Sequence, residues 1–181
     1  MDRILLAAGE QRPLLLVLYH TMGRVGEILR LRWEDVLFEH RVVVLYTRKR
    51  SGGNLEPDTY PMSDTLYNTL RSLYEKRQSE EWVFPNPLTG GRFNNRPKLM
   101  RGICKRAGVS YYGFHSIRHY VANLLADSEK VSTKRISRLL RHTNVRTTEI
   151  YLGKDLEDLG ETVKLLDKNF VPEKNPAQSQ E

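Results

Sequence analysis

The sequence predicts one mainly helical domain with a small antiparallel β-sheet, the α+β class. Apolar residues recur at helical spacing along most of the chain, whereas only RVVVLY, residues 41–46, is rich in β-branched residues. The chain has 181 residues, of which 39% are hydrophobic, enough to bury one sizeable core. We find no internal repeat, so a single domain is expected.

Three helices are predicted before the sheet. The second begins near Pro13, because proline is favoured in the first turn of a helix. The third begins near Arg24 and runs through Leu31 toward Trp33. The apolar residues of the first two helices are Ile4, Leu5, Ala8, Leu14, Leu15, Val17 and Leu18.

The sheet is predicted as a small hairpin or meander. The strand at 41–46 is followed by Ser51-Gly52-Gly53-Asn54, a sequence that can reverse the chain. A return strand should end near Met62. The two strands therefore carry a short basic tip between them, Arg48-Lys49-Arg50.

Helices dominate the rest of the chain. Ser63 or Asp64 can cap a helix that carries Leu66, Leu70 and Leu73, and PNPLTGGRFNN at 85–95 is typical of a loop. Further helices are expected at 99–107, 115–126, 133–141 and 155–168. We assign residues 1–171 to the domain and 172–181, which are polar, to a flexible tail.

Charge and cysteine content narrow the function. Lysine and arginine number 29 against 22 acidic residues, so the net charge is +7 and the pI is about 9.6. This favours a polyanionic partner such as nucleic acid, although a solvated basic surface would look the same. Cys104 is the only cysteine, which excludes a disulfide framework and a thiolate zinc site. With no signal peptide or membrane span in the sequence, we expect a cytoplasmic protein.

Two pairs of residues are spaced to act together. His115 and Arg118 lie three positions apart, so on a helix they share a face and could address one phosphate. Arg24 and Glu27 have the same spacing. Either pair could also be an ordinary surface feature; an exposed ion pair contributes only about 0–1 kcal/mol. Alternatively, Glu27 holds the Arg24 guanidinium so that its fork faces a ligand.

Three further residues are candidates by position. Lys49 sits at the mouth of the hairpin, where a lysine could reach a nucleic-acid groove. His142 follows an apolar helix, and Asn144 or Thr147 can begin a short helix that leads to Tyr151. Taken singly, a histidine or tyrosine in such places is more often a cap, surface or packing residue.

The order of these residues resembles the tyrosine recombinase family, the phage-type integrases and their relatives. The resemblance runs from about Leu5 to Lys168. It is carried by TMGRVGEILRLRWEDV with Arg24, by Lys49, by FHSIRHYVA with His115 and Arg118, and by LLRHTNVRTTEIYL with His142 and Tyr151. It implies the fold of the DNA breaking-rejoining catalytic domain.

The resemblance also implies a role for each residue. Tyr151 is the nucleophile on a DNA phosphodiester and forms a 3′-phosphotyrosyl link with a free 5′-hydroxyl. Arg24 and Arg118 bind the non-bridging oxygens, and His142 hydrogen-bonds the phosphate. Lys49 protonates the leaving 5′-oxygen, and His115 acts as general base or proton shuttle.

The chemistry of these side chains is consistent with such roles. Two permanently charged guanidiniums can neutralise the charge that gathers on the equatorial oxygens, so no metal or other cofactor is expected. A phenol of pKa about 10 is a poor nucleophile at neutral pH and needs a base or a cationic field. His115 and the two arginines could supply both.

Three departures from the family pattern qualify the assignment. Met22-Gly23 precedes Arg24, where the family commonly has glycine followed by an apolar residue. Arg141 stands in place of a glycine before His142 and adds a charge that could contact the DNA backbone. Arg48 and Arg50 flank Lys49, and a hairpin slip of one residue would exchange them; both are further candidates for DNA contact.

The resemblance implies more than this chain contains. Family members carry an N-terminal DNA-clamping domain, which we expect to be absent here, since the motifs begin almost at the first residue. An isolated catalytic domain should bind double-stranded DNA weakly. The family also assembles as tetramers on DNA, partly by exchange of a C-terminal segment, whereas an isolated domain could be a monomer. Residues 161–169 are the candidate segment; alternatively, they pack on their own domain.

Three other functions were weighed. A metal-dependent nuclease would need clustered carboxylates, but the acidic residues are scattered among basic ones. A non-catalytic helical DNA-binding module has no need of the Arg, His-x-x-Arg, His, Tyr series. A type IB topoisomerase shares much of the chemistry, although the amino-acid sequences of the motifs are closer to those of an integrase.

Overall fold

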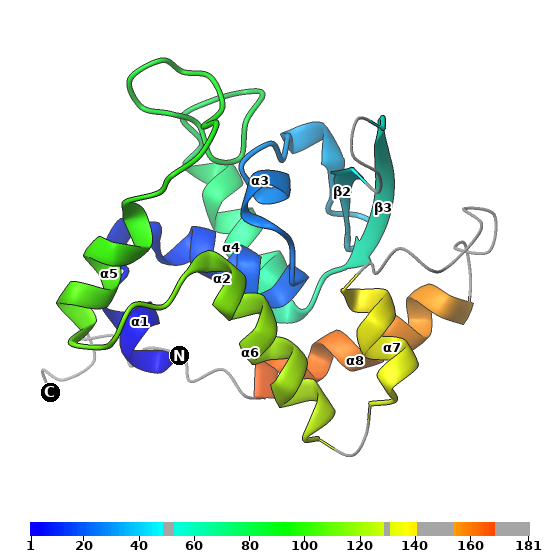
Figure 1. The fold of residues 1–181 in the computed structure, drawn as a ribbon. Helices are drawn as coiled ribbons and strands as arrows, with labels where there is room; N and C mark the ends of the chain where they lie inside the picture. Colours follow the sequence, from blue (N-terminus) through cyan, green and yellow to red (C-terminus); the bar gives the residue numbers. More distant parts are fainter. Residues whose placement is uncertain (49–52, 129–130, 141–153, 169–181) are drawn as a thin grey trace, which may run out of the picture.

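The computed structural model describes residues 1–48, 53–128, 131–140 and 154–168, and the fold is helical around one small sheet (Figure 1). The α-helices are α1 (Asp2–Leu6), α2 (Arg12–Thr21), α3 (Val25–Ile28), α4 (Asp64–Glu75), α5 (Leu99–Ala107), α6 (Phe114–Ala126), α7 (Thr133–Leu139) and α8 (Lys154–Lys168). Two 3-10 turns, η1 (Gly9–Gln11) and η2 (Trp33–Asp35), join them. The strands are β1 (Val36–Leu37), β2 (Val42–Arg48) and β3 (Leu55–Pro61). The expected mainly helical α+β class is confirmed.

Helix α2 is the central element of the core. It packs against α1, α4 and α6, and Leu14, Leu15, Val17 and Leu18 are all at most 1% exposed. Pro13 lies in its first turn, as the sequence predicts. Met22 ends the helix in the left-handed conformation at φ 50°. Because α2 is buried on nearly every side, its C-terminal end is held in place, and the turn toward Arg24 starts from a fixed position.

The third helix is shorter than the spacing predicts. It ends at Ile28, and Arg24 is its N-cap rather than a helical residue. The backbone of the following residues pairs elsewhere: the Val83 N–H donates to the Leu31 carbonyl at 3.1 Å, and the Trp33 N–H donates to the Glu81 carbonyl at 3.0 Å. Leu31 is therefore buried without being helical, and the expectation that the helix continues toward Trp33 was wrong.

The sheet is the three-stranded meander β1-β2-β3, antiparallel throughout. Val43 of β2 lies opposite Val36 of β1 and Tyr60 of β3. Along β2, Val42, Val43, Leu45 and Thr47 are buried, whereas Arg48 is exposed. Strand β2 lies against α3, so alternate side chains along the strand face α3 and the core.

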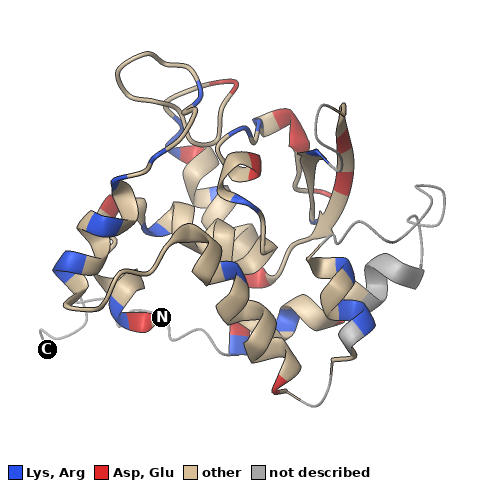
Figure 2. Ribbon diagram, in the orientation of Figure 1, with Lys and Arg blue, Asp and Glu red and all other residues tan. Residues whose placement is uncertain are grey.

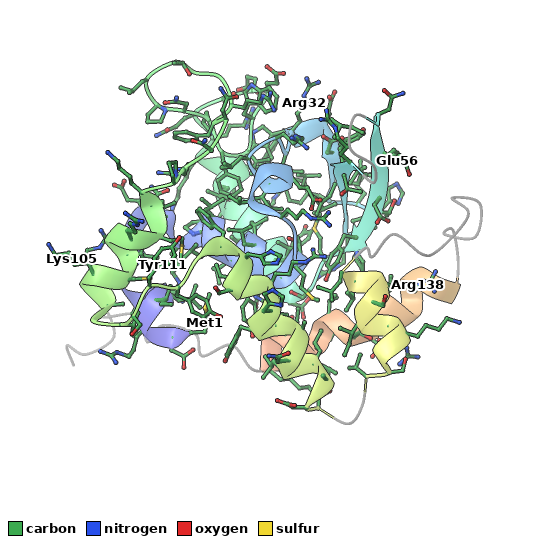
Figure 3. The ribbon with its side chains drawn as sticks, in the orientation of Figure 1. Met1, Arg32, Glu56, Lys105, Tyr111 and Arg138 are labelled. Carbon is green, nitrogen blue, oxygen red and sulfur yellow. The ribbon has the colours of Figure 1, made fainter. Side chains whose placement is uncertain are left out.

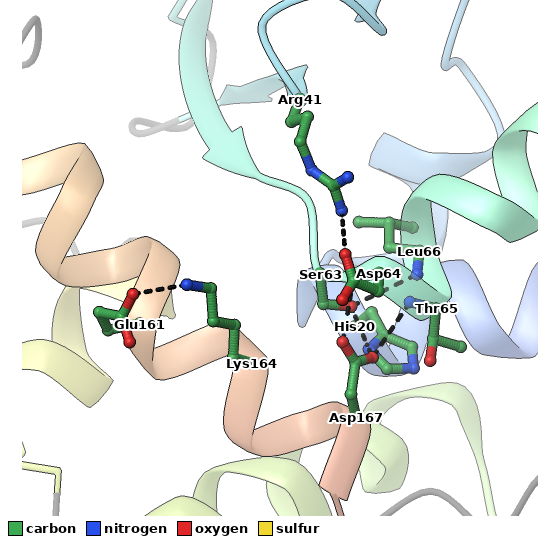
Figure 4. Close-up of polar contacts among 9 residues, drawn as sticks. All are labelled: His20, Arg41, Ser63, Asp64, Thr65, Leu66, Glu161, Lys164 and Asp167. Atoms are coloured by element: carbon green, nitrogen blue, oxygen red, sulfur yellow. Dashed lines mark hydrogen bonds and ion pairs between the residues drawn. The ribbon is translucent and has the colours of Figure 1, made fainter.

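The last helix lies on its own domain in this structure. It packs against α4, α7 and β3. Figure 4 shows the polar contact at the start of α4, where Ser63 is the N-cap and accepts from the Leu66 N–H at 3.3 Å. The Asp167 carboxylate of α8 accepts from the Asp64 N–H at 2.9 Å and from the Thr65 N–H at 3.2 Å. Of the two capping residues considered for α4, Ser63 is confirmed.

Within the described residues, no helix has both the length and the apolar composition that a membrane crossing requires.

Candidate active site

Arg24 is fixed by the tight turn that joins α2 to α3. A Cβ on Gly23 would lie 2.7 Å from Cδ1 of Ile28, so only glycine allows this approach without displacement. The Arg24 N–H donates to Oε2 of Glu27 at 2.9 Å, and Nη1 of Arg24 donates to Oε1 of Glu27 at 3.0 Å. The Glu27 carboxylate thus accepts from both the guanidinium and the backbone N–H of Arg24, the N-cap of α3.

The exposure of the two side chains separates the alternatives for this pair. The Glu27 side chain is 4% exposed, whereas that of Arg24 is 48% exposed. A buried carboxylate that holds one nitrogen of a half-exposed guanidinium leaves the other side of the fork open to a ligand. The geometry therefore matches a positioned arginine better than an ordinary surface ion pair.

Thr47 also contacts Arg24, and the sequence did not single it out. Its Oγ1 accepts from Nη1 of Arg24 at 2.9 Å, and the residue is 1% exposed. Thr47 lies on β2, 23 residues along the chain from Arg24. The signal in the sequence that could have identified Thr47 was its position on the predicted hairpin, two residues before Lys49. The contact ties the basic hairpin to the first motif.

Arg118 joins the same region from α6. It is 5% exposed, and its Nη1 and Nη2 donate to the carbonyls of Met22 and Leu140, respectively. Met22 is two residues before Arg24, and Leu140 is the residue that ends α7. The buried guanidinium thus holds the ends of two helices together and is itself oriented by them.

His115 lies on the same helix one turn earlier, at the exposed surface. Its ring packs edge-on against that of His119, with 4.5 Å between the centroids. Partial burial lowers the pKa of His115 below its usual value, and the positive charges of His119, Arg118 and Arg24 lower it further. A neutral imidazole is therefore favoured here. His115 lies one helical turn before Arg118, and Arg118 contacts the carbonyl of Met22, two residues before Arg24, so the three residues belong to one region of the structure.

Of the remaining candidate residues, the structure describes only Arg48. Lys49, Arg50, Arg141, His142 and Tyr151 lie outside the described residues. Arg48 is described: it ends β2 opposite Leu55, on the exposed side of the strand. Leu140, the residue before Arg141, accepts from Arg118 at the site.

The described cluster has the chemistry of an oxyanion site. It combines two guanidiniums with a neutral imidazole. The carboxylate in this cluster, that of Glu27, already accepts a hydrogen bond from Arg24. Permanent positive charge with N–H donors suits a phosphate whose non-bridging oxygens must be neutralised.

Comparison with known proteins points the same way. The model of the phage integrase family matches residues 4–157. The chain is 29% identical over 171 residues to a XerC-like tyrosine recombinase of Caldanaerobacter subterraneus, covering 76% of this chain and 44% of that protein. It is also 29% identical over 168 residues to the tyrosine recombinase XerA of Thermococcus kodakarensis, covering 87% of this chain and 56% of that protein. The chain thus spans about half the length of the curated relatives it matches.

Solved structures share the fold. The crystal structure of XerA recombinase superposes with a TM-score of 0.66 at 21% identity, covering 95% of this chain and 63% of that chain. The Tn1549 transposon integrase, in complex with a circular intermediate DNA, superposes with a TM-score of 0.61 at 16% identity, covering 75% of this chain and 52% of that chain. The expected tyrosine recombinase catalytic-domain fold is confirmed.

Proposed function

The chain belongs to the phage integrase family, and on that premise we propose that it is the catalytic domain of a tyrosine site-specific recombinase. It cleaves and rejoins DNA strands without a metal, through a covalent bond between the DNA and Tyr151. We assign this activity to residues 1–171. The observation that carries the proposal is that Arg118 contacts the carbonyl of Met22, two residues before Arg24, while Glu27 and Thr47 orient the Arg24 guanidinium.

In the proposed reaction, the Tyr151 hydroxyl oxygen attacks the scissile phosphorus while the bond to the 5′-oxygen breaks. Arg24 and Arg118 neutralise the non-bridging oxygens, and His142 hydrogen-bonds one of them. His115, with its lowered pKa, accepts the phenol proton. Lys49 gives a proton to the leaving 5′-oxygen. The 3′-phosphotyrosyl bond conserves the energy of the phosphodiester, so another 5′-hydroxyl can reverse the step without ATP.

We propose Lys49, rather than Arg48, as the general acid. Thr47, the residue that reaches Arg24, belongs to the odd-numbered buried positions of the strand. Arg48 has the opposite parity and an exposed side chain. We assign Arg48, whose side chain is exposed, to a DNA backbone contact, and we extend this proposal to Arg50 and Arg141.

The proposed partner is double-stranded DNA. Its support is the net charge of +7 together with the fold shared with an integrase solved in complex with DNA. We extend the proposal to a tetramer on DNA. In that assembly residues 161–169 would exchange between protomers, in place of the packing of α8 on its own domain described above.

The test is formation of a covalent adduct in EDTA. Nicked duplexes carrying candidate attachment sites from the DNA that flanks the gene would be incubated with the protein, denatured and resolved by electrophoresis. The nick releases a short strand after cleavage, so the adduct accumulates. We expect an adduct that Tyr151→Phe abolishes and that Arg118→Lys reduces, because lysine retains the charge but loses the fork. Tyr111→Phe, at an exposed tyrosine on the surface, is the matched control and should leave the adduct intact.

Three results would overturn the proposal. An adduct that persists in Tyr151→Phe would place the nucleophile elsewhere. An adduct that requires a divalent metal would indicate a different reaction. Firm DNA binding without an adduct on any of these substrates would identify a DNA-binding module without catalytic activity.

A further inference from the structure

A second basic site lies beside the Arg24 cluster. It is a pocket of about 540 Å³ between the α3–η2 corner, the sheet and the segment before α5. Its lining includes Arg30, Arg32, Asp35, Tyr46, Trp82 and Arg92. Figure 2 marks basic residues near this corner and along the segment before α5, and Figure 3 labels Arg32 there. None of these residues has a role in the reaction proposed above.

Two of the arginines in this pocket, Arg30 and Arg92, form no ion pair with a residue that the structure describes. Arg30 is half-buried; its Nη1 donates to the Tyr46 carbonyl at 3.5 Å, and its buried Nε finds no acceptor among the described residues. Arg92 is exposed, and neither it nor Arg30 forms an ion pair with a described residue. Burial lowers the pKa of the Arg30 guanidinium, and the charge of Arg92 lowers it further; the Glu27 carboxylate opposes this lowering, and Arg48 adds to it. Like charges gathered in this way favour an anion between them.

The carboxylates nearby are already engaged. Glu34 pairs with Arg32 at 3.0 Å, and Glu81 lies 3.4 Å from the same guanidinium. The Arg32 guanidinium also lies over the Trp82 ring, 5.0 Å from its centroid. Asp35 hydrogen-bonds with Tyr46. Glu34, Glu81 and Asp35 therefore leave Arg30 and Arg92 as the cations that can bind a ligand.

The pocket adjoins the Arg24 site along one strand. Arg24 contacts the side chain of Thr47, and Arg30 contacts the carbonyl of Tyr46, the preceding residue of β2. The Arg30 N–H also donates to the Glu27 carbonyl at 3.3 Å. The pocket and the Arg24 site therefore adjoin consecutive residues of β2.

We propose that Arg30 and Arg92 together bind one backbone phosphate of DNA, near the phosphate that Arg24 addresses. The inference rests on the proposed function for its ligand, because DNA is the polyanion that function supplies. Its ligand chemistry, a phosphate monoanion or dianion, could also come from free inorganic phosphate, and the experiment separates the two sources.

The experiment measures the affinity for a fluorescent duplex by anisotropy over a series of salt concentrations. Arg30→Gln and Arg92→Gln should each weaken binding roughly three- to tenfold, and each should reduce the slope of log K against log salt by up to about 1. Because both contact the same phosphate, the double variant should lose about 1 in slope, not 2. Arg71→Gln is the matched control: Arg71 of α4 pairs with Glu75 at 3.6 Å and does not line the pocket, so binding should be unchanged.

The outcomes distinguish this inference from the proposed function. If the parent protein forms the Tyr151 adduct but the pocket variants bind DNA with unchanged affinity and slope, the inference fails while the function stands. If no adduct forms but the pocket variants lose affinity and slope, the inference stands while the function fails. Calorimetry with inorganic phosphate is the last measurement. If Arg30→Gln abolishes phosphate binding but leaves the salt dependence of DNA binding unchanged, the pocket is a site for free phosphate and the DNA assignment is overturned.

Discussion

Replacing Thr47 by valine tests whether a side chain on the sheet holds the first arginine of the site. Valine has nearly the shape of threonine but lacks the oxygen that accepts from Nη1 of Arg24 at 2.9 Å. Thr47 is 1% exposed, so water cannot readily take the place of that oxygen. Glu27 still accepts from the same nitrogen at 3.0 Å, so the guanidinium retains one anchor and loses the other.

The magnitude follows from these contacts. A hydrogen bond to a charged group contributes about 1.5–3 kcal/mol. The lower end applies here, because the Arg24 side chain is 48% exposed and retains Glu27. If the whole contribution acts on the orientation of the fork in the transition state, the cleavage rate falls roughly tenfold. Stability should change less, by about 1 kcal/mol, which corresponds to about 2–4 °C in Tm for a domain of this size.

The assay is adduct formation in a single turnover at saturating duplex, so that DNA binding does not limit the rate. Thr47→Ser, which retains the hydroxyl, is the control and should stay within about threefold of the parent. Thermal unfolding of both variants shows whether a slow protein is merely unfolded. A valine variant as fast as the parent, or a serine variant as slow as the valine one, would refute the reasoning.

Two predictions concern pH. The pKa of His115 is lowered from the usual 6.5, so its neutral form persists as the pH falls. The acid limb of the pH profile of the cleavage rate should therefore lie below pH 6.5. His119→Gln removes one of the charges responsible and should move this limb to higher pH. A parent limb at or above pH 6.5 would contradict this. Burial lowers the pKa of His20 to about 4, against the opposing charge of Asp167, so the unfolded chain binds the proton more tightly between pH 6.5 and 4. Stability is therefore complete above pH 6.5 and should fall by roughly 3 kcal/mol as the pH drops to 4. Urea unfolding over this range measures the loss, and a slope unchanged in His20→Asn would assign it to other groups.

Local sequence patterns predicted most helices because their apolar spacing and caps lie within a few neighbouring residues. Pro13 and Ser63 mark helix starts that the structure confirms. The third helix was overestimated because its end depends on hydrogen bonds between Leu31 and Val83, which are 52 positions apart. No pattern within one segment contains that information.

The sequence by itself determined the family, the candidate side chains and the pairs whose spacing is local. His115 and Arg118, and likewise Arg24 and Glu27, are three positions apart, so one helical turn brings each pair together. The tertiary structure decided which separate segments meet. Thr47 reaches Arg24 from the sheet, and Arg118 reaches the carbonyls of Met22 and Leu140. These contacts exist because the core around α2 places α3, β2, α6 and α7 side by side, and that packing depends on every element at once.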